Sequence, residues 1–524
     1  MAPGNEIGQQ LLQLVSSELS DLKLTPAEEA LFIEFPLGNP INLSDDKAER
    51  NDPGKSEDWG DNRTIHASYI EWLVTNKQAK EHLTHRGIRI QGARIVGSID
   101  LEHTSSACPL ELRMCVLTES LVLRHARLKS VNLQGSHINR IEAEDVTIDG
   151  NLLFGDGFRC EGEVSLKYGT IAGVLNCESG EFHNPHGNAI SADGMNVKGG
   201  VFLQEGFKAE GEVRLLGATI GGSLECGGGE FHNPDGFALD ADGVNVRGDV
   251  FLRDNFKAEG WVSFPGVHIE GWLIWTGVRD RSGTVMDLRG ARVVRLWDSV
   301  DSWPDAGNLH LQGFCYGEID DDAPQDAKER IRWLRLQPSG QFFPQPYEQL
   351  ANVLRKKGYE KAAKEVQIAK NVDRRRRGSM PLLLRPFHCL FGFLTGYGYR
   401  PWRPLAAALL LIGVGWGLFH AGAREGIIMK VGTERFATVG EQNGDFVQPS
   451  FHPLLYSFDI FLPVITFEQA KNWAPNENAI GRLVGDIPIS GLVLCSYTSF
   501  LNLAGWILTT LFVATLTGTI RRRM

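Results

Sequence analysis

The chain has few of the features that mark a redox-active, secreted or nucleic-acid-binding protein. Its eight cysteines are scattered and form no CxxC pair, which argues against a disulfide framework, a zinc ribbon and a thioredoxin-like centre. No GxGxxG follows a predicted strand, and there is no haem or flavin motif. The net charge of −11 gives no reason to expect a nucleic-acid partner, because such surfaces are usually basic. We therefore predict no cofactor and no catalytic residue.

Long apolar runs are absent from positions 1–380, where the chain is polar and rich in Gly. The N-terminus, MAPGNEIGQQLLQLVSSELS, has no Lys or Arg before Lys23 and no long apolar stretch, so it does not read as a secretory signal. We expect this part of the chain to stay in the cytosol. From position 381 onward, Leu, Ile, Val, Phe and Trp dominate. A chain of 524 residues with this uneven composition predicts two or more units.

Apolar residues recur every five positions in part of the polar region. The series is Leu123, Leu128, Leu133, Ile138, Ala143, Ile148, Leu153 and Phe158. A helix needs steps of three and four, and a free-standing amphipathic strand needs steps of two. A step of five suits a chain that turns a corner after each short strand and points one apolar residue inward per side.

A longer period of 49 positions overlies the first. The segments GFRCEGEVSLKYGTIAGVLNC, GFKAEGEVRLLGATIGGSLEC and NFKAEGWVSFPGVHIEGWLIW are three copies of one unit. The copies align Phe158 with Phe207 and Phe256, Glu161 with Glu210 and Glu259, and Cys177 with Cys226 and Trp275. GEFHNPHGNAISADG and GEFHNPDGFALDADG lie between the copies and carry turn formers, so we expect them to bulge out as loops.

These periods predict a mainly β fold, a β-solenoid over residues 88–312 with Gly at the corners. About ten coils spaced about 4.8 Å apart would make a rod on the order of 50 Å long. Its ends need caps, because an open sheet edge recruits other strands. Residues 62–87 have a helical apolar face and fit the N-terminal cap, preceded by a helical or flexible region over residues 1–61. Ala in GARI, HARL and GATI resembles the pentapeptide-repeat class, which implies a right-handed β-helix.

The solenoid offers two further groups of polar residues, and for both a structural interpretation is favoured. A metal site would combine Cys177, Cys226 and the histidines His183, His186 and His232. However, Trp275 replaces the cysteine in the third copy and Asp235 replaces His186, so we predict that the cysteines are core residues and expect no metal. The acids Glu161, Glu210, Glu259, Asp193 and Asp242 recur at the repeat period and are expected to form a solvated ladder rather than a catalytic groove.

Residues 313–380 change pattern and predict a helical connector. QPYEQLANVLRKKGYEKAAKEVQIAKNVDRRRRG reads as two amphipathic helices separated by Gly358. The pair has the look of a single tetratricopeptide-type hairpin. We favour a structural adaptor over a peptide-binding role, since one copy cannot form an array.

Residues 381–524 predict an α-helical membrane domain with two spans, at about 402–421 and 491–520. Basic clusters flank the outer chain ends of both spans: Arg374 to Arg377 before the first and Arg521 to Arg523 after the second. The positive-inside rule then places both termini in the cytosol and residues 422–486 on the other face. Pro381 to Leu394 is apolar but short, and is expected to lie along the inner interface.

The segment TGYGYRPW looks like a potassium-channel filter, but its position excludes that role. It precedes the first span, whereas a filter follows a pore helix and precedes the second span. Between the spans, residues 452–465 form a half-length apolar segment, which suggests a re-entrant or pore-helix-like element containing Asp459. In the second span, Asn502, Thr509, Thr510 and Thr517 fall on one helical stripe. Asp459, Asn502, Thr509 and Thr510 are the candidate pore or intramembrane polar residues.

The motifs YEQLANVLRKKG, AKNVDRRRRG, GYGYRPWR, SFDIFLPVI and GWILTTLFVATLTGTIRR resemble a family of bacterial membrane proteins. That family has a cytosolic pentapeptide-like β-helix and a C-terminal two-span tail similar to the pore unit of ion channels. The resemblance implies a protein of the bacterial inner membrane. Some look-alikes are labelled membrane-associated oxidoreductases, a label for which this sequence has no motif.

Two main functions remain open from the sequence. In the first, the tail is a channel-like pore unit regulated by the solenoid, which requires a homo-oligomer because two spans cannot enclose a pore. In the second, the tail anchors a scaffold or sensor in the lipid bilayer, and the solenoid docks an unidentified cytosolic protein or ligand. The oxidoreductase label is a third alternative. Residues 463–487 contain no TVGYG, so selectivity for potassium is not expected.

Overall fold

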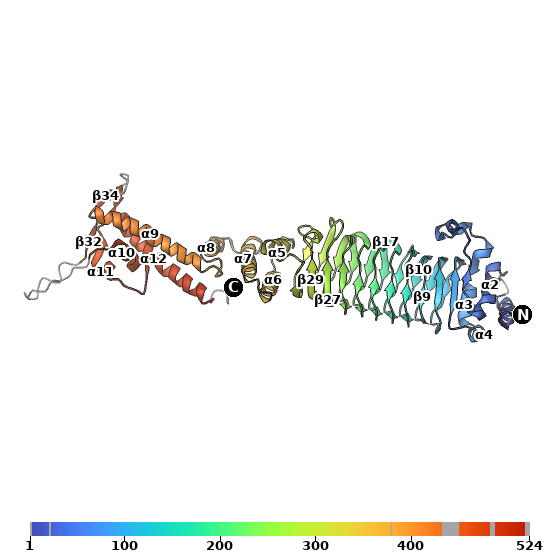
Figure 1. Ribbon diagram of the computed structural model, residues 1–524. Coiled ribbons are helices and arrows are strands. Elements are labelled where there is room, and N and C mark those ends of the chain that lie inside the picture. Colours follow the sequence, from blue (N-terminus) through green and yellow to red (C-terminus); the bar gives the residue numbers. More distant parts are fainter. Residues whose placement is uncertain (1–2, 20–22, 379, 432–449, 483–487, 519–524) are drawn as a thin grey trace, which may run out of the picture. The chain divides into compact units, whose positions relative to one another are not determined.

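The structure is a computed structural model that describes residues 3–19, 23–378, 380–431, 450–482 and 488–518. It divides into two compact units, Met1–Val366 and Gln367–Met524, with the boundary inside helix α7 (Glu360–Arg377). The first unit is a parallel β-solenoid of about ten turns, and the second is helical (Figure 1). The predicted mainly β fold, a solenoid followed by helices of which two are long and apolar, is confirmed.

The solenoid strands belong to two parallel sheets of 18 and 13 strands. The larger sheet contains β1 (Ile41–Asn42), β3 (Ile88–Gln91), β6 (Leu110–Arg113), β8 (Arg127–Leu128), β9 (Val131–Asn132), β11 (Thr147–Ile148), β12 (Leu152–Leu153), β15 (Thr170–Ile171), β16 (Leu175–Asn176), β18 (Asn196–Val197), β19 (Val201–Phe202), β21 (Thr219–Ile220), β22 (Leu224–Glu225), β24 (Asn245–Val246), β25 (Val250–Leu252), β27 (His268–Trp275), β29 (Arg292–Asp298) and β31 (Cys315–Ile319). The smaller sheet contains β2 (Thr64–His66), β4 (Arg94–Val96), β5 (Ile99–Asp100), β7 (Val116–Val122), β10 (His137–Glu142), β13 (Arg159–Cys160), β14 (Val164–Ser165), β17 (Glu181–Ser191), β20 (Lys208–Arg214), β23 (Glu230–Asp240), β26 (Lys257–Ser263), β28 (Thr284–Asp287) and β30 (Leu309–His310).

Strand register explains the longer of the two sequence periods. Leu175 pairs with Val201 in the next coil, and Val201 pairs with Leu224 in the coil after that. Leu224 is the repeat equivalent of Leu175 (224 − 175 = 49), so one sequence repeat covers two successive coils, and these are of unequal length. The coils are longer than four five-residue sides require, so this part of the solenoid departs from a strict pentapeptide pattern.

A phenylalanine ladder runs through the centre of these coils. Phe158, Phe182, Phe207, Phe231 and Phe256 are all at most 1% exposed, and successive ring centroids lie 5.4, 5.3, 5.1 and 5.3 Å apart. The sequence repeat aligned three of these residues, and the other two come from the intervening coils. Tilted aromatic contacts at this spacing add to the stabilisation from buried area.

One detail of the predicted pattern is wrong, and another is confirmed. Leu153 is only half-buried, and its neighbours Leu152 and Phe154 point inward instead, because the five-residue step slips after Gly150. The HNP-containing segments lie within the long strands β17 and β23, and they bulge out as expected, since residues 184–187 and 233–236 have no partner in the following strand. Each strand takes up its extra residues as a bulge, for instance between His183 and Asn188.

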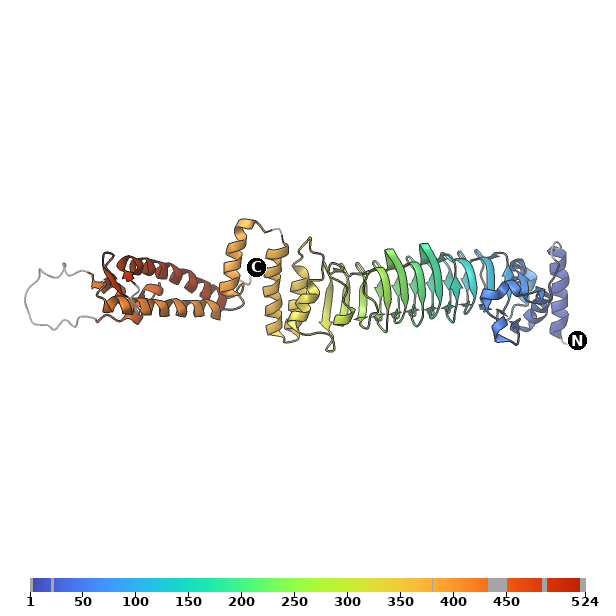
Figure 2. The same ribbon diagram turned by 90° about the horizontal axis from the view of Figure 1, so that it is seen from above.

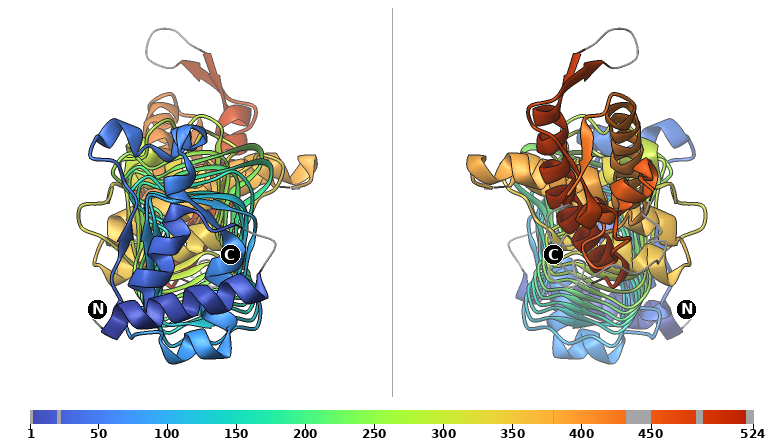
Figure 3. Two further views of the ribbon diagram at one scale, coloured as in Figure 1. Left: turned by 90° about the vertical axis from the view of Figure 1, so that its right-hand side faces the viewer. Right: turned by 90° about the vertical axis from the view of Figure 1, so that its left-hand side faces the viewer.

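Short helices close the N-terminal end of the solenoid, and α1 lies across that end when the coils are viewed along their axis (Figure 3). The helices are α1 (Pro3–Glu18), α2 (Pro26–Glu34), α3 (Ala67–Thr75) and α4 (Lys77–Glu81), with 3₁₀ turns η1 (Phe35–Leu37), η2 (Ala48–Arg50), η3 (Pro53–Asp58) and η4 (Asp61–Arg63). The buried Glu28 carboxylate joins α2 to the first coil, since it accepts hydrogen bonds from the backbone N–H groups of Thr25 and His66.

The other end of the solenoid is closed by α5 (Ala327–Leu334) and α6 (Gln345–Lys356), which follow the 3₁₀ turn η5 (Val300–Ser302). Side chains at this end donate to backbone carbonyls of the last coil: Gln345 to Phe314, Gln349 to Tyr316, and Lys357 to Ile319. These hydrogen bonds occupy backbone carbonyls in and next to β31 that could otherwise pair with a strand of another chain. The first part of the predicted connector is thus a cap of the solenoid.

The second unit contains α8 (Arg385–Thr395), α9 (Trp402–Arg424), α10 (Pro453–Phe461), α11 (Gln469–Asn472), α12 (Gly491–Leu516), the 3₁₀ turn η6 (Leu382–Leu384) and two antiparallel strand pairs, β32 (Ile428–Lys430) with β33 (Trp473–Pro475) and β34 (Ile480–Arg482) with β35 (Pro488–Ser490). Helices α9 and α12 lie side by side and antiparallel, since a Cβ on Gly422 would meet Leu494 and one on Gly415 would meet Leu501 (Figure 2).

Helices α9 and α12 are long and apolar enough to cross a membrane. Only 28% and 22% of their apolar windows are buried, whereas a core helix of a soluble protein would be mostly covered. The predicted spans at about 402–421 and 491–520 match these helices over the described residues. Arg521 to Arg523, on which part of the topology prediction rests, lie outside the described residues.

The GYGY segment forms the turn between α8 and α9. Tyr397 is 2% exposed, has a left-handed backbone (φ 55°), and packs against His388 with tilted rings whose centroids are 4.8 Å apart. Its ring occupies the space beside Gly392, where a Cβ would overlap it. Tyr397 is therefore buried against α8 and is not an exposed interfacial anchor. Trp402, in contrast, is 61% exposed.

Candidate functional site

The half-length helix α10 packs against both long helices of the second unit, as Figure 1 shows. Tyr456 packs edge-on against Phe419 of α9, with ring centroids 4.8 Å apart. On the other side, a Cβ on Gly505 of α12 would overlap the carbonyl oxygen of Phe461. The last turn of α10 thus approaches α12 as closely as only glycine allows.

The segment after α10 and one stripe of α12 line a single groove with a volume of about 530 Å³. Its lining residues are Pro463, Val464, Trp506, Thr509, Thr510, Val513, Ala514 and Thr517. We call this set the α12 groove. Val464 is 85% exposed and Trp506 is 55% exposed, so within one chain the groove is open.

Two of the four predicted site residues, Thr509 and Thr510, line the α12 groove. The Thr510 hydroxyl donates to the carbonyl of Trp506 (2.7 Å), so its oxygen lone pairs remain available to a cation or water. Asn502 is exposed on the same stripe but is not among the lining residues. The stripe itself follows from helical geometry, since Thr509 and Thr510 follow Asn502 by seven and eight residues, about two turns of the helix.

Asp459 organises the chain beside the groove rather than lining it. Its two carboxylate oxygens accept hydrogen bonds from the backbone N–H groups of Phe467 and Ala470, both at 2.7 Å. These bonds fix the path of residues 462–470, which include the groove residues Pro463 and Val464. The carboxylate therefore positions the segment that follows α10.

Sequence reasoning missed five lining residues of the groove: Pro463, Val464, Trp506, Val513 and Ala514. Trp506 falls on the stripe defined by Asn502 and Thr510, but a pattern based on polar residues passes over an aromatic. Pro463 and Val464 become relevant only because the Phe461 carbonyl reaches Gly505. A tertiary contact of that kind has no periodic signature.

In the solenoid, the structure separates the cysteines and histidines that a metal site would have combined. Cys177 and Cys226 are fully buried in the interior, and burial raises the pKa of both thiols above its usual range. His183 and His232 lie on the outer face, where Nδ1 of each contacts a repeat carboxylate: Glu210 at 2.6 Å and Glu259 at 2.9 Å. The repeated acids are thus engaged in pairs along the coils.

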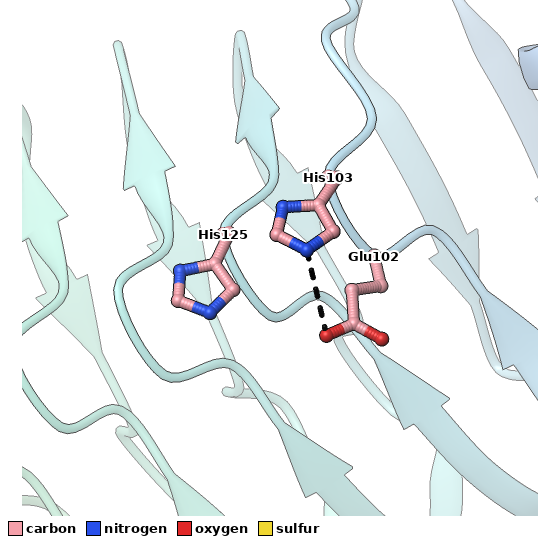
Figure 4. Close-up of side chains that lie close together, drawn as sticks. All are labelled: Glu102, His103 and His125. Carbon is pink, nitrogen blue, oxygen red and sulfur yellow. Dashed lines mark ion pairs between the residues drawn. The ribbon is translucent and has the colours of Figure 1, made fainter.

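A second polar cluster lies at an N-terminal corner of the solenoid and was not identified from the sequence (Figure 4). His103 and His125 stack with ring centroids 4.8 Å apart, and with Glu102 they bring three ligand-type atoms within 4.8 Å of one another. The signal for it is that the two histidines are separated in the sequence by one coil. However, the Arg124 guanidinium binds both Glu102 oxygens (3.1 and 3.0 Å), and these hydrogen bonds lower the pKa of Glu102. The neighbouring positive charge disfavours a cation there.

Comparison with known proteins returned no matching family model, no matching curated protein and no matching solved structure. The resemblance to bacterial membrane proteins therefore stays a prediction based on the quoted motifs. The coarser conclusion rests on the structure alone: a solenoid followed by two possible spans is compatible with a membrane-anchored solenoid protein.

Proposed function

We propose that the second unit is the subunit of a channel-type pore in the bacterial inner membrane, formed by several copies of the chain and regulated by the cytosolic solenoid. The observation that carries this proposal is the α12 groove. It combines the segment after a half-length helix with the polar stripe of a possible span. That is the order of elements in which pore units present a filter segment and a lining helix.

The exposed polar stripe supports assembly from several copies. Asn502 and Thr510 are exposed in a single chain, although apolar residues such as Leu503 (62% exposed) and Ile507 (49% exposed) cover the adjacent sector of the same helix. Polar side chains at membrane depth face water or another helix. One chain with two spans cannot enclose water, so copies related by rotation would have to supply the other walls.

The proposed topology keeps both termini in the cytosol. Its described support is the cluster Arg374 to Arg377 before α9, because basic residues close to a span are retained on the cytoplasmic side. Residues 463–487 contain no TVGYG, so the proposal names no selectivity for potassium.

Planar bilayer recording of the full-length protein tests the pore. Thr510→Val keeps the shape of a lining residue and removes its hydroxyl, and Asp459→Ala frees the segment that holds Pro463 and Val464. We expect both variants to change the unitary conductance, and the matched control Leu503→Ala, on the adjacent exposed sector of α12, to leave it unchanged. Absence of current from folded, oriented wild-type protein would contradict the proposal of a pore.

A second candidate function is a membrane-anchored scaffold or sensor, and one observation favours it. Phe237, Trp261 and His310 form a partly exposed aromatic row on the 13-stranded sheet, with ring centroids 6.0 and 5.4 Å apart. Aromatic rows of this kind suit docking of a partner. This function predicts no current from any variant, so the same recording separates the two. No observation on the described residues favours the oxidoreductase label.

A further inference from the structure

The chain carries positive charge without negative charge where it approaches the first possible span. Residues 374–403 contain seven arginines and neither Asp nor Glu. Four of the arginines end α7, and Arg385 begins α8. Charge of one sign over so long a stretch is not expected of a surface that only faces water, because such surfaces usually mix both signs.

Three of these arginines surround a shallow depression of about 580 Å³ between the end of α7 and the start of α8. Arg375, Arg376 and Arg385 supply its charge, and Leu382, Pro386 and Cys389 supply its apolar part. We call this set the α7–α8 depression. Arg375 is held in place because it donates to the hydroxyl of Tyr397 (3.3 Å), and Arg385 donates through Nε to the carbonyl of Met380 (3.3 Å).

Among the described residues, no carboxylate forms an ion pair with Arg375, Arg376 or Arg385. The local field is accordingly positive. Burial, together with the nearby Arg375 and Arg374 guanidinium groups, lowers the pKa of His388, as expected of a ring in a positive field. The depression therefore suits an anion.

The apolar side of the depression continues along α8 and the turn before it. Leu382, Leu383, Phe387 and Phe393 are 75%, 86%, 72% and 73% exposed. A helix with a large exposed apolar face beside arginines lies in the plane of a membrane interface, with that face in the acyl region. Arginines at the same level then meet lipid headgroups.

We propose that the α7–α8 depression binds the phosphate of an anionic phospholipid, whose acyl chains cover the exposed face of α8. Guanidinium groups pair with phosphate oxygens in a planar, two-pronged geometry, which suits a phosphate better than a diffuse negative surface. The apolar neighbours Leu382 and Pro386 favour a lipid over a free anion or a nucleic acid. This inference rests on the membrane association of the proposed function, but not on pore formation.

The test is a titration of detergent-solubilised full-length protein in which binding is measured by microscale thermophoresis. The probes are dioctanoyl phosphatidylglycerol, dioctanoyl phosphatidylcholine and inorganic phosphate. We expect the anionic lipid to bind at least about tenfold more tightly than the zwitterionic lipid, because nearby basic residues contribute to anionic lipid binding one by one. Inorganic phosphate, which lacks acyl chains, should bind more weakly than phosphatidylglycerol.

Paired variants separate a site from general charge. Arg376→Gln/Arg385→Gln should weaken phosphatidylglycerol binding about tenfold, and Arg376→Lys/Arg385→Lys, which keeps the charge but not the two-pronged geometry, should restore only a small part of it. The control Arg400→Gln/Arg403→Gln removes two charges from the same acid-free stretch and should change binding less than about threefold. Equal losses in both Gln pairs, equal binding of the two lipids, or binding of inorganic phosphate as tight as that of the lipid would each overturn the site. The titration needs no current, so its failure and that of the pore are distinguishable.

Discussion

The two units of this chain solve the burial of apolar residues in opposite ways. The solenoid turns its repeated side chains inward, and Phe207, Leu224 and Cys226 are 0% exposed. The second unit turns many outward, and Leu410 and Leu503 are 66% and 62% exposed on its two long helices. The solenoid is thus complete within one chain in water, whereas the helical unit is complete only when something apolar covers it.

Glycine shows the same contrast. In the solenoid, glycines such as Gly217 and Gly243 lie at corners with φ of 63° and 66° and open space around them, so it is backbone conformation that favours glycine there. In the second unit, Gly505 lies within regular helix, and it is required because Phe461 approaches so closely. Small residues that let backbones approach are typical of helices packed in membranes.

The largest effect is expected from the one described ion pair that the solenoid cap buries completely. Arg330 and Asp298 are both 0% exposed, with Nη2 and Oδ1 2.7 Å apart, and Trp303 donates to the same carboxylate. Arg330→Met leaves that carboxylate uncompensated and should cost about 3–5 kcal/mol of the free energy of unfolding of the solenoid. Urea unfolding followed by tryptophan fluorescence measures it.

The control is an exposed pair between β29, which also carries Asp298, and β31. Arg295 contacts Glu318 at 2.9 Å with 34% and 41% of the side chains exposed. Arg295→Met should cost less than about 1 kcal/mol. Equal costs for the two variants would show that the cap does not depend on its buried charges.

The next effect is expected at the contact between α10 and α12. Gly505→Ala places a methyl group against the Phe461 carbonyl, so the helices must separate, at a cost of about 1–3 kcal/mol. Gly413→Ala in α9 meets nothing within 4 Å and should be neutral or slightly stabilising. Thermal unfolding in detergent compares the two, and a similar melting temperature for both variants would contradict the packing of α10 on α12.

How much of this could be predicted from the sequence also differs between the units. The five-residue step from Leu123 to Ile148 predicted inward positions correctly because each coil repeats the same environment. It failed at Leu153, where the coil length changes from one repeat to the next. In the second unit, composition predicted α9 and α12 and placed Thr509 and Thr510 on one stripe. Composition could not predict that Asp459 accepts hydrogen bonds from backbone N–H groups, because those donors lie in an irregular segment further along the chain.

An effect of similar size is expected within the phenylalanine ladder. Phe207 contacts Phe182 and Phe231 with ring centroids 5.3 and 5.1 Å away, so Phe207→Leu loses two aromatic contacts and should cost about 1–3 kcal/mol. Phe237→Leu, at a position 39% exposed, should cost about 0.5 kcal/mol or less. Urea unfolding measures both. Equal costs for Phe207→Leu in the ladder and Phe237→Leu outside it would contradict the ladder as the core of the coils.

The smallest effect concerns the acids on the outer face of the solenoid and their dependence on pH. Lys257 donates to Glu259, and the charges of Lys257 and His232 add to this, so the pKa of the Glu259 carboxyl lies below its ordinary value of 4.5. A lowered pKa stabilises the folded state above the unfolded value, and this contribution is lost as the pH falls from about 4.5 through the folded pKa.

Between pH 5 and about 3, wild-type protein should therefore lose about 0.5 kcal/mol more stability than Glu259→Gln, a small amount because the pair is partly exposed to water. The acid-free stretch 374–424 of the second unit has no carboxylate that could respond in this range. As the pH falls, the solenoid should therefore lose stability at a higher pH than α8 and α9 do. Hydrogen exchange at decreasing pH measures this order. Loss of protection in the α8–α9 turn at a higher pH than in the solenoid would contradict it.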